Sequence, residues 1–145
     1  PADRQNRLAK LYTEDSTGRI QPLPARGGLS PDYPKQAGTF YSGGAGLSST
    51  AYDYAIFLQM LLNGGTYNGR QLLSPATVRM ITSNQIGELS LGANKFGLGF
   101  GLYTDKTQAR IGASVGSFDW GGIFGTSYWA DPKEKIVGVL LTQKY

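Results

Sequence analysis

One amphipathic segment narrows the fold of this chain more than any other feature. The stretch GLSSTAYDYAIFLQMLLNGG repeats large apolar side chains at the three- and four-residue spacing of a single helix face, at Tyr54, Phe57, Leu58, Leu61 and Leu62. Thr50 and Asp53 have the spacing of a capping box, with Ser49 as the alternative cap. Gly64 stands where a helix ends in a left-handed residue. The pattern predicts a helix over about 50–63.

The segments that follow predict a second helix and then antiparallel strands. Ser74 and Pro75 have the order of an N-cap and a first helical residue, so we expect a helix from there to about Thr82. TSYWADPKEKIVGVLLTQ has the pattern of a strand, an Asp-Pro-Lys-Glu turn and a second strand. Helices followed by antiparallel strands favour an α+β fold, with an antiparallel sheet flanked by helices.

The chain divides into three parts by composition. Residues 1–46 form an irregular lead-in that is dense in prolines and other turn formers. Residues 47–85 form the helical segment, and residues 95–145 form the antiparallel strands. A long irregular lead-in is uncommon in a compact domain and suggests a segment that wraps over something else. We therefore expect residues 1–145 to make up a single partial domain.

Residue totals exclude several classes of function. The net charge of +4 is modest and the basic residues are scattered, so we expect no nucleic-acid groove. The longest apolar run is far too short for a membrane span. The absence of histidine and cysteine excludes a Ser-His-Asp triad, a cysteine nucleophile and the usual zinc ligands. Any catalysis must use lysine, tyrosine or a carboxylate as the base, or groups from another polypeptide.

The pentapeptide Gly112-Ala113-Ser114-Val115-Gly116 matches G-x-S-x-G, the strand-to-helix turn that presents a nucleophilic serine in lipases and esterases. That turn needs a helix directly after the serine, but the glycine-rich, aromatic residues that follow have poor helix propensity. The chain also has no histidine to act as the base. We therefore interpret Ser114 as a small residue at a strand-edge turn.

Three segments, in this order, resemble the C-terminal part of a family of serine hydrolases. They are GGAGLSSTAYDYAIFLQMLLNGG, KFGLGFGLY and SVGSFDWGGIFGTSYWADPKEKIVGVLLTQ, and they cover roughly residues 43–145. The family includes class C β-lactamases, penicillin-binding DD-peptidases and β-lactamase-like esterases. The resemblance implies the C-terminal portion of a β-lactamase/DD-peptidase-like fold and a bacterial enzyme.

The resemblance also implies a substrate-binding strand. In that family a strand lining the pocket carries K-T-G or a variant, and Trp120-Gly121-Gly122 resembles the W-x-G form of the esterase-like branch. These three residues are then expected to contact the substrate, and the backbone N–H of Ile123 is expected to be one oxyanion-hole donor. The competing interpretation is that Trp120 is a core aromatic beside a glycine-rich turn.

Two motifs of the family have no counterpart in this chain. Its nucleophile is the serine of an S-x-x-K motif, and none of the seven lysines here has a serine three residues before it. The second motif, Y-x-N or S-x-N, is absent as well. We therefore expect the C-terminal part of a longer enzyme, inactive alone, whose N-terminal portion comes from the same chain or from a cleaved partner. That portion would also cover a sheet edge that is otherwise exposed.

The implied reaction is acyl transfer through a serine ester, followed by hydrolysis, without a metal or an organic cofactor. The expected substrate is a small ester or amide. Tryptophan offers no charged donor to a substrate carboxylate, which favours esters. The alternative is a non-catalytic binding or scaffold module of the same fold. A periplasmic or secreted location and a cytoplasmic location are both compatible with the sequence.

Other candidate residues carry less weight. Asp119 adjoins the expected pocket and would add polarity there, whereas Asp131 and Glu134 fall in the expected hairpin turn. A set of aromatic residues could form a sugar- or acyl-binding surface, although such residues more often fill cores and strand pairs. The set comprises Tyr103, Phe118, Trp120, Phe124, Tyr128 and Trp129.

Overall fold

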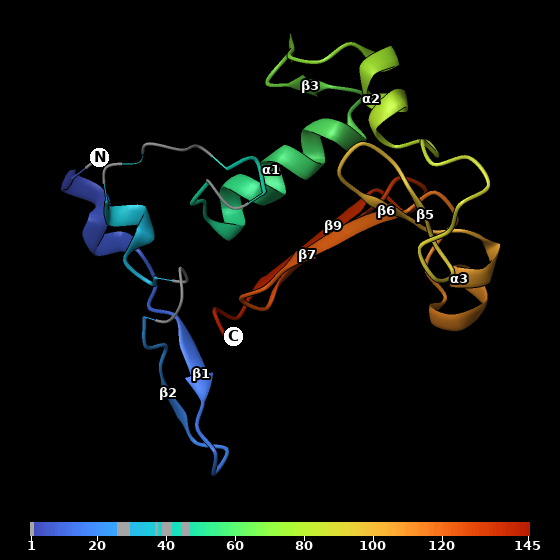
Figure 1. The fold of residues 1–145 in the computed structure, drawn as a ribbon. Coiled ribbons are helices and arrows are strands. Elements are labelled where there is room, and N and C mark those ends of the chain that lie inside the picture. The colour runs from blue at the N-terminus through green and yellow to red at the C-terminus, as the bar shows by residue number, and fades with distance from the viewer. Residues whose placement is uncertain (1, 26–29, 37, 39–41, 45–46) are drawn as a thin grey trace.

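The centre of the molecule is a five-stranded antiparallel sheet of order β5-β6-β7-β8-β9 (Figure 1). The structure, a computed structural model, describes residues 2–25, 30–36, 38, 42–44 and 47–145. The strands of the sheet are β5 (Lys95–Phe96), β6 (Gly101–Leu102), β7 (Phe118–Gly122), β8 (Thr126–Asp131) and β9 (Ile136–Leu141). Within these residues three α-helices accompany the sheet, so the predicted α+β class is confirmed.

Short elements complete the described chain. The described part of the lead-in contains two 3₁₀ helices, η1 (Ala2–Arg7) and η2 (Tyr33–Lys35). It also contains the hairpin of β1 (Tyr12–Glu14) and β2 (Ile20–Pro22). A second small hairpin, of β3 (Thr66–Tyr67) and β4 (Arg70–Gln71), connects the first two α-helices.

Helix α1 (Ala51–Leu62) begins and ends as its sequence predicts. The Thr50 side chain accepts the Asp53 N–H at 3.1 Å, which satisfies one of the free donors of the first turn. After the helix, Gly64 and Gly65 both have positive φ, and a Cβ on Gly65 would lie 2.1 Å from the Leu73 carbonyl oxygen. Only glycine fits this close approach, which holds β3–β4 against the end of α1.

Helix α2 (Pro75–Ile81) confirms the second predicted helix. The Ser74 side chain accepts the Thr77 N–H at 3.0 Å. Pro75 occupies the first turn, where a missing N–H costs nothing.

Helix α3 (Asp105–Ile111) is a correction, because it lies within residues 95–145, for which the sequence analysis predicts strands alone. Its start has a capping box in which Thr104 and Thr107 satisfy each other's backbone donors, and its end is the left-handed Gly112. These signals are present in the sequence. The alternation of glycine with large apolar residues just before Thr104 favours strands and obscured them.

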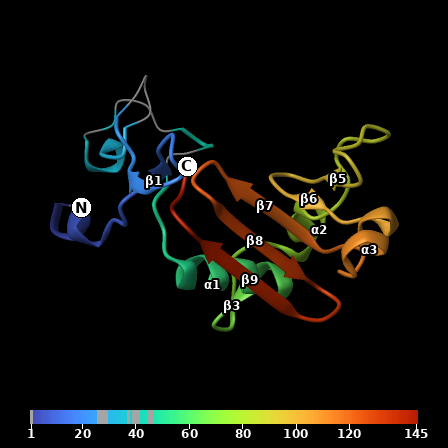
Figure 2. The same ribbon diagram turned by 90° about the horizontal axis from the view of Figure 1, so that it is seen from below.

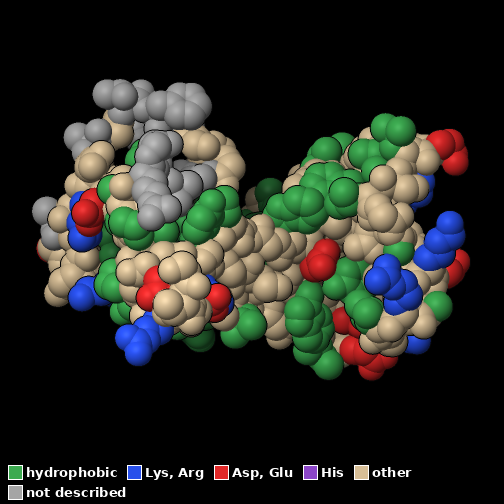
Figure 3. Space-filling view, turned by 60° about the horizontal axis from the view of Figure 1, so that its bottom comes forward, with side chains coloured by type: hydrophobic (Ala, Val, Ile, Leu, Met, Phe, Trp, Pro, Cys, Tyr) green, Lys and Arg blue, Asp and Glu red, His purple; other side chains and the backbone are tan. Residues whose placement is uncertain are grey.

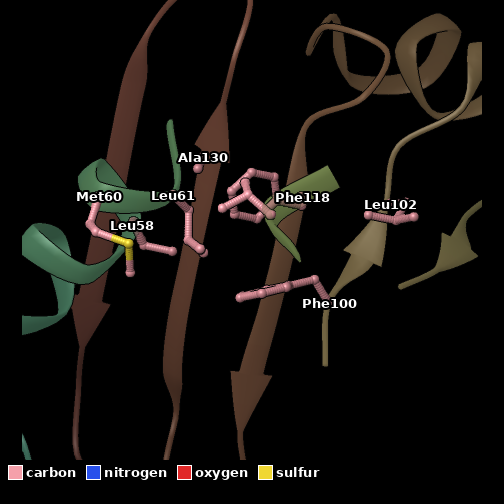
Figure 4. Packing of buried hydrophobic residues seen from close by; sticks show 8 residues of the cluster. Leu58, Met60, Leu61, Phe100, Leu102, Phe118 and Ala130 are labelled. Carbon is pink, nitrogen blue, oxygen red and sulfur yellow. The ribbon is translucent and has the colours of Figure 1, made fainter. Parts of the chain in front are cut away.

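The core lies between α1 and one face of the sheet (Figure 4). Apolar side chains from α1, α2 and strands β6 to β8, together with Phe100 beside β6, form one buried cluster, which consists of Leu58, Met60, Leu61, Val78, Phe100, Leu102, Phe118 and Ala130. The aromatic rings of Phe100 and Phe118 meet edge-on, with centroids 5.0 Å apart. Burial of this cluster is the main force that holds α1 on the sheet.

The two faces of the sheet differ in what covers them. Tyr128 lies opposite Trp120 on β7 and Val139 on β9, so these three side chains share the face that bears α1. Trp129 and Gly138 form the next pair along and point to the other face. Figure 2 shows α1 behind strands β7 to β9, with this second face toward the viewer. We call it the open face.

The open face carries large exposed apolar side chains. Trp129, Ile136 and Leu140 are 41%, 50% and 62% exposed. A Cβ on Gly138 would lie 2.6 Å from Nε1 of Trp129, because the indole ring lies directly over this glycine. Among the described strands β9 pairs with β8 alone, so its outer edge is also unpaired.

The lead-in meets the rest of the molecule at the end of the chain. The Tyr12 N–H donates to the Gln143 carbonyl at 3.0 Å, and the Tyr145 N–H donates to the Tyr12 carbonyl at 2.8 Å. Lys144 forms an ion pair with Glu14, which lies on β1 together with Tyr12. In Figures 1 and 2 the β1–β2 hairpin accordingly lies beside the C-terminus and away from α3.

Candidate functional site

The second half of β7 is an open strand edge. Strand β6 pairs only with Phe118 and Asp119, so the outer edge of Trp120, Gly121 and Gly122 has no strand beside it in the described part of the chain. A shallow groove of about 550 Å³ follows this edge. The space-filling view in Figure 3 shows the molecule hollowed between the lobe with the N-terminal lead-in and the lobe with α3.

The groove brings together all four residues that the resemblance singled out. Its lining consists of Asn94, Asp119, Trp120, Gly121, Gly122, Ile123, Thr126 and Ser127. Of these, Asn94, Thr126 and Ser127 are additions to the sequence prediction. The hairpin register places Thr126 and Ser127 opposite Gly122 and Gly121, so a correct strand pairing could have found them. Asn94 comes from a loop before β5, and no local pattern connects it with β7.

Trp120 is half-exposed, at 42%, and does not belong to the buried core cluster. Its indole meets the ring of Phe96 edge-on, with centroids 4.9 Å apart and an interplanar angle of 73°. This contact braces one side of the indole and leaves the rest available as a wall of the groove. Its role in binding stays a prediction.

The two glycines of the motif allow the chain to pass close to β8. A Cβ on Gly122 would lie 2.3 Å from Oγ1 of Thr126, and a Cβ on Gly121 would lie 3.1 Å from the Thr126 carbonyl oxygen. A larger residue at Gly122 would therefore have to displace the Thr126 side chain. The glycines keep both the groove and the hairpin narrow.

Ile123 begins the turn between β7 and β8, and its side chain is 64% exposed. The neighbouring Gly125 N–H donates to the Gly122 carbonyl at 3.1 Å, which closes the turn. In contrast, the Ile123 N–H donates to no acceptor within the described residues. An unpaired N–H at the rim of a groove can bind the oxygen of a ligand.

Asp119 is the acidic group of the site. Its Oδ2 accepts a hydrogen bond of 3.0 Å from the Tyr103 hydroxyl. Burial raises the pKa of Asp119, although the Tyr103 hydrogen bond opposes this change. Burial and the nearby carboxylate raise the pKa of Tyr103 to about 12, so the tyrosine stays protonated and acts as the donor.

Ser114 has a structural position. Its residue is 6% exposed, and its backbone N–H donates to Oδ2 of Asp131 at 3.2 Å. The pentapeptide runs from the end of α3 at Gly112 through a tight turn into β7. This order is helix, turn, strand, the reverse of the strand-turn-helix order that presents a nucleophile.

Asp131 and Glu134 form no catalytic pair. Oδ1 of Asp131 accepts the N–H groups of Lys133 and Glu134 at 2.9 and 3.0 Å, so it organises the β8–β9 turn. Burial alone would raise the pKa of Asp131, but the hydrogen bonds from Glu134, Ser114 and Lys133 outweigh it and lower the pKa. Glu134 is an exposed turn residue.

The aromatic set does not form one surface. Phe118 belongs to the core and Tyr128 packs against it, whereas Trp129 lies on the open face. Phe124 lies at the β7–β8 turn with its ring 6.3 Å from that of Tyr145. These positions match the interpretation of most of these residues as core and strand-pair fillers.

The chemistry that the groove offers is limited. Its lining has an amide donor, two hydroxyls and a carboxyl group, but no lysine or arginine. Within the described residues no group of three or more acidic side chains could hold a metal ion. None of the helices in the described part of the chain has the length and apolar character needed to cross a membrane.

Known proteins match the chain along its whole length. The family model described as Beta-lactamase matches residues 1–145. An uncharacterized protein of Mycobacterium tuberculosis (strain CDC 1551 / Oshkosh) is 34% identical over 155 residues, which make up 98% of this chain and 37% of that protein.

Two solved structures share the fold. EstCE1, a hydrolase with promiscuous acyltransferase activity, superposes with a TM-score of 0.81 and 27% identity, over 99% of this chain and 40% of its own. A penicillin-binding protein homolog from Caulobacter crescentus superposes with a TM-score of 0.60 and 21% identity, over 99% of this chain and 41% of its own, and it supports the fold alone. The chain therefore spans about two fifths of the length of these relatives.

These matches cover the segments from which the resemblance was drawn. They confirm both the resemblance and the predicted β-lactamase/DD-peptidase-like fold. The chain belongs to the β-lactamase family and has its hydrolase fold.

Proposed function

We propose that this chain is the C-terminal part of a serine hydrolase that cleaves small esters by acyl transfer through a serine ester. The observation that carries the proposal is the unpaired N–H of Ile123 at the rim of the groove, directly after Trp120-Gly121-Gly122. A further support is the resemblance in sequence and fold to EstCE1, whose title describes a hydrolase with promiscuous acyltransferase activity.

The residues of this chain would serve the reaction by binding and polarising the substrate. When the serine oxygen attacks the ester carbonyl carbon, negative charge develops on the carbonyl oxygen. The Ile123 N–H, with the N–H of the nucleophilic serine, would hold this oxygen, and such a donor typically contributes about 10²–10³ in rate. Trp120 would form an apolar wall for the acyl or alcohol group, and Gly121 would let the substrate lie close to β7.

The nucleophile and its base would come from the remainder of a longer polypeptide. The groove has no lysine in its lining, and the sequence has no S-x-x-K or Y-x-N. The relatives are more than twice as long as this chain, which leaves room for both motifs. On this proposal the serine hydroxyl proton passes to the lysine or tyrosine base and then to the leaving alcohol, and water releases the acid from the acyl-serine.

The same remainder would cover the open face and the free edge of β9. Trp129, Ile136 and Leu140 expose apolar surface on one side of the sheet, while α1 covers only the other side. An apolar face next to an unpaired strand edge is unusual for a stable surface. We therefore assign this face to the N-terminal portion of the enzyme, whether in the same chain or as a cleaved partner.

The test compares the 145-residue chain with the longer polypeptide that contains it, using p-nitrophenyl butyrate as an ester and nitrocefin as a β-lactam. We expect no turnover of either compound by the chain alone. The longer polypeptide should hydrolyse the ester, and Ser114→Ala should leave that rate unchanged because Ser114 is structural.

Two results would contradict the proposal. Turnover by the chain alone that Ser114→Ala abolishes would make Ser114 the nucleophile. A longer polypeptide that binds esters but turns over neither compound would favour the non-catalytic binding or scaffold module of the same fold.

A further inference from the structure

The turn that carries Ile123 is held from outside by the last residues of the chain. Thr142 donates two hydrogen bonds to the Gly125 carbonyl, from its hydroxyl at 2.8 Å and from its N–H at 3.3 Å. The Lys144 N–H donates to the Phe124 carbonyl at 2.8 Å. The rings of Phe124 and Tyr145 also lie near each other at a tilt of 55°, with centroids 6.3 Å apart.

The turn needs such support because its own sequence is flexible. Residues 121–125 read Gly-Gly-Ile-Phe-Gly, and glycine loses more backbone freedom on folding than any other residue. Gly125 has φ +67, and a Cβ there would lie 2.2 Å from Oγ1 of Thr142. The close contact between Gly125 and Thr142 therefore depends on this glycine.

The lead-in in turn holds the last residues in place. Tyr12 of β1 accepts the N–H of Tyr145 and donates its own N–H to the Gln143 carbonyl. Glu14 of the same strand forms an ion pair with Lys144. The contacts thus run from β1 through residues 142–145 to the β7–β8 turn, although β1 and this turn lie at opposite ends of the sequence.

We propose that residues 142–145, held by β1, position the Ile123 N–H for the reaction, with Thr142 as the main positioning residue. We call residues 142–145 together with β1 the clamp. This inference rests on the proposed function, in which Ile123 binds the carbonyl oxygen. An oxyanion donor stabilises the transition state only if its direction is fixed beforehand, and a misplacement of about 1 Å can cost 10²-fold in rate.

The clamp contacts Phe124 and Gly125, the turn residues that follow the oxyanion donor, and not the walls of the groove. Thr142, Lys144 and Tyr145 are absent from the groove lining, whereas Trp120 and Gly121 belong to it. Loosening the clamp should therefore lower kcat with little change in KM. A hydrogen bond of ordinary strength corresponds to a roughly three- to tenfold fall in kcat.

The experiment uses the longer polypeptide and four substitutions, one of which, Glu14→Gln, removes the charge that pairs with Lys144. Thr142→Val removes the hydroxyl and keeps the shape of the side chain, and Thr142→Ser keeps the hydroxyl. Thr66→Val is the matched control, because the Thr66 hydroxyl bonds to Gln71 at 3.0 Å in the distant β3–β4 hairpin. The readouts are kcat and KM with p-nitrophenyl butyrate, and the amide hydrogen exchange of the peptide that spans the β7–β8 turn.

We expect Thr142→Val to speed exchange at the turn and to lower kcat roughly three- to tenfold. Thr142→Ser should restore both, and Thr66→Val should change neither. Glu14→Gln should have a smaller effect, below about twofold, because its ion pair is half-exposed.

Unchanged exchange in Thr142→Val would show that the clamp does not hold the turn, and faster exchange with unchanged kcat would show that it does not position the donor. Either result overturns the inference while ester hydrolysis by the unsubstituted enzyme still supports the proposed function. An enzyme without any turnover would overturn the proposed function and the positioning role together, whereas the exchange result would still decide whether the clamp holds the turn.

Discussion

The two tryptophans of this chain lie on neighbouring strands and are almost equally exposed, at 42% for Trp120 and 41% for Trp129. Their surroundings differ in the side chains that lie beside each indole ring. Trp120 leans on Phe96 at a groove with an unpaired amide, a carboxyl group and hydroxyls. Trp129 covers Gly138 on the open face, beside the exposed apolar side chains of Ile136 and Leu140, and its cross-strand neighbour on β7 is Asp119.

The comparison teaches that exposure alone does not identify a binding residue. Polar groups that converge beside an aromatic ring favour a site for a small molecule, because they fix a ligand's orientation. A patch of exposed apolar side chains such as Trp129, Ile136 and Leu140 favours contact with another part of a protein. We assign the groove to the substrate and the open face to the remainder of the polypeptide on this difference.

The largest expected effect is a loss of activity on substitution of Gly122 at the groove, compared with Gly138 on the open face. Gly122→Ala in the longer polypeptide would force its Cβ against the Thr126 hydroxyl and move the Ile123 N–H. We expect kcat/KM for p-nitrophenyl butyrate to fall about 10²-fold, while the free energy of unfolding changes less. Gly138→Ala is the matched control, because its Cβ would meet the Trp129 indole and should lower stability without this loss of activity. Equal losses of activity in both variants would remove the distinction between the regions.

The next largest effect is expected from replacing each of the two tryptophans with alanine. Trp120→Ala should lower kcat/KM roughly tenfold, because it removes one wall of the groove and its apolar contact with the substrate. Trp129→Ala should keep the activity of the folded enzyme and reduce the free energy of unfolding by about 3 kcal/mol, as expected for a tryptophan that the longer polypeptide buries. Hydroxyl-radical footprinting of the longer polypeptide should then label Trp120 and spare Trp129. Equal kinetic effects would count against the W-x-G assignment.

The smallest expected effect concerns two carboxyl groups. Burial raises the pKa of Asp119, so its contribution to stability falls as the pH rises from the ordinary value of 3.8 through the raised folded pKa. The pKa of Asp131 is lowered, so its contribution is present above 3.8 and is lost as the pH falls through the folded pKa. Urea unfolding at about pH 3 and pH 7 should show that Asp131→Asn loses stability mainly at the higher pH. Asp119→Asn should show the opposite change, and the same sign for both would show that the groove does not disfavour charge.

Local patterns predicted much of the fold. The stripe and caps of α1, the Ser-Pro start of α2 and the turn of the β8–β9 hairpin are all contained within short stretches, so the sequence alone could reveal them. Helix α3 has equally local signals, but the glycine-rich residues before it favoured strands. The two patterns occupy neighbouring residues and both are realised, the glycine-rich pattern as β5 and β6 and the helix signals as α3.

The residues of the site also divide into those that a local motif reveals and those that only the folded structure brings together. Trp120, Gly121, Gly122 and Ile123 are consecutive, so one motif was enough to find them together. Asn94 and Phe96 come to the groove from a separate loop and strand. Tyr12 bonds to Gln143 and Tyr145, although nearly the whole sequence separates them. Such contacts depend on tertiary packing, and a single sequence has no local signal for them.

The indole of Trp129 over Gly138 also restricts which substitutions this face can accept during evolution. A side chain at position 138 has no room while the tryptophan is present, since even a Cβ would lie 2.6 Å from the ring nitrogen. The glycine could therefore gain a side chain without loss of stability only if a smaller residue had first replaced the tryptophan. The two positions are coupled, and the order of substitutions matters as much as their identity. Among relatives of this chain, a larger residue at the position of Gly138 should accompany a smaller one at the position of Trp129.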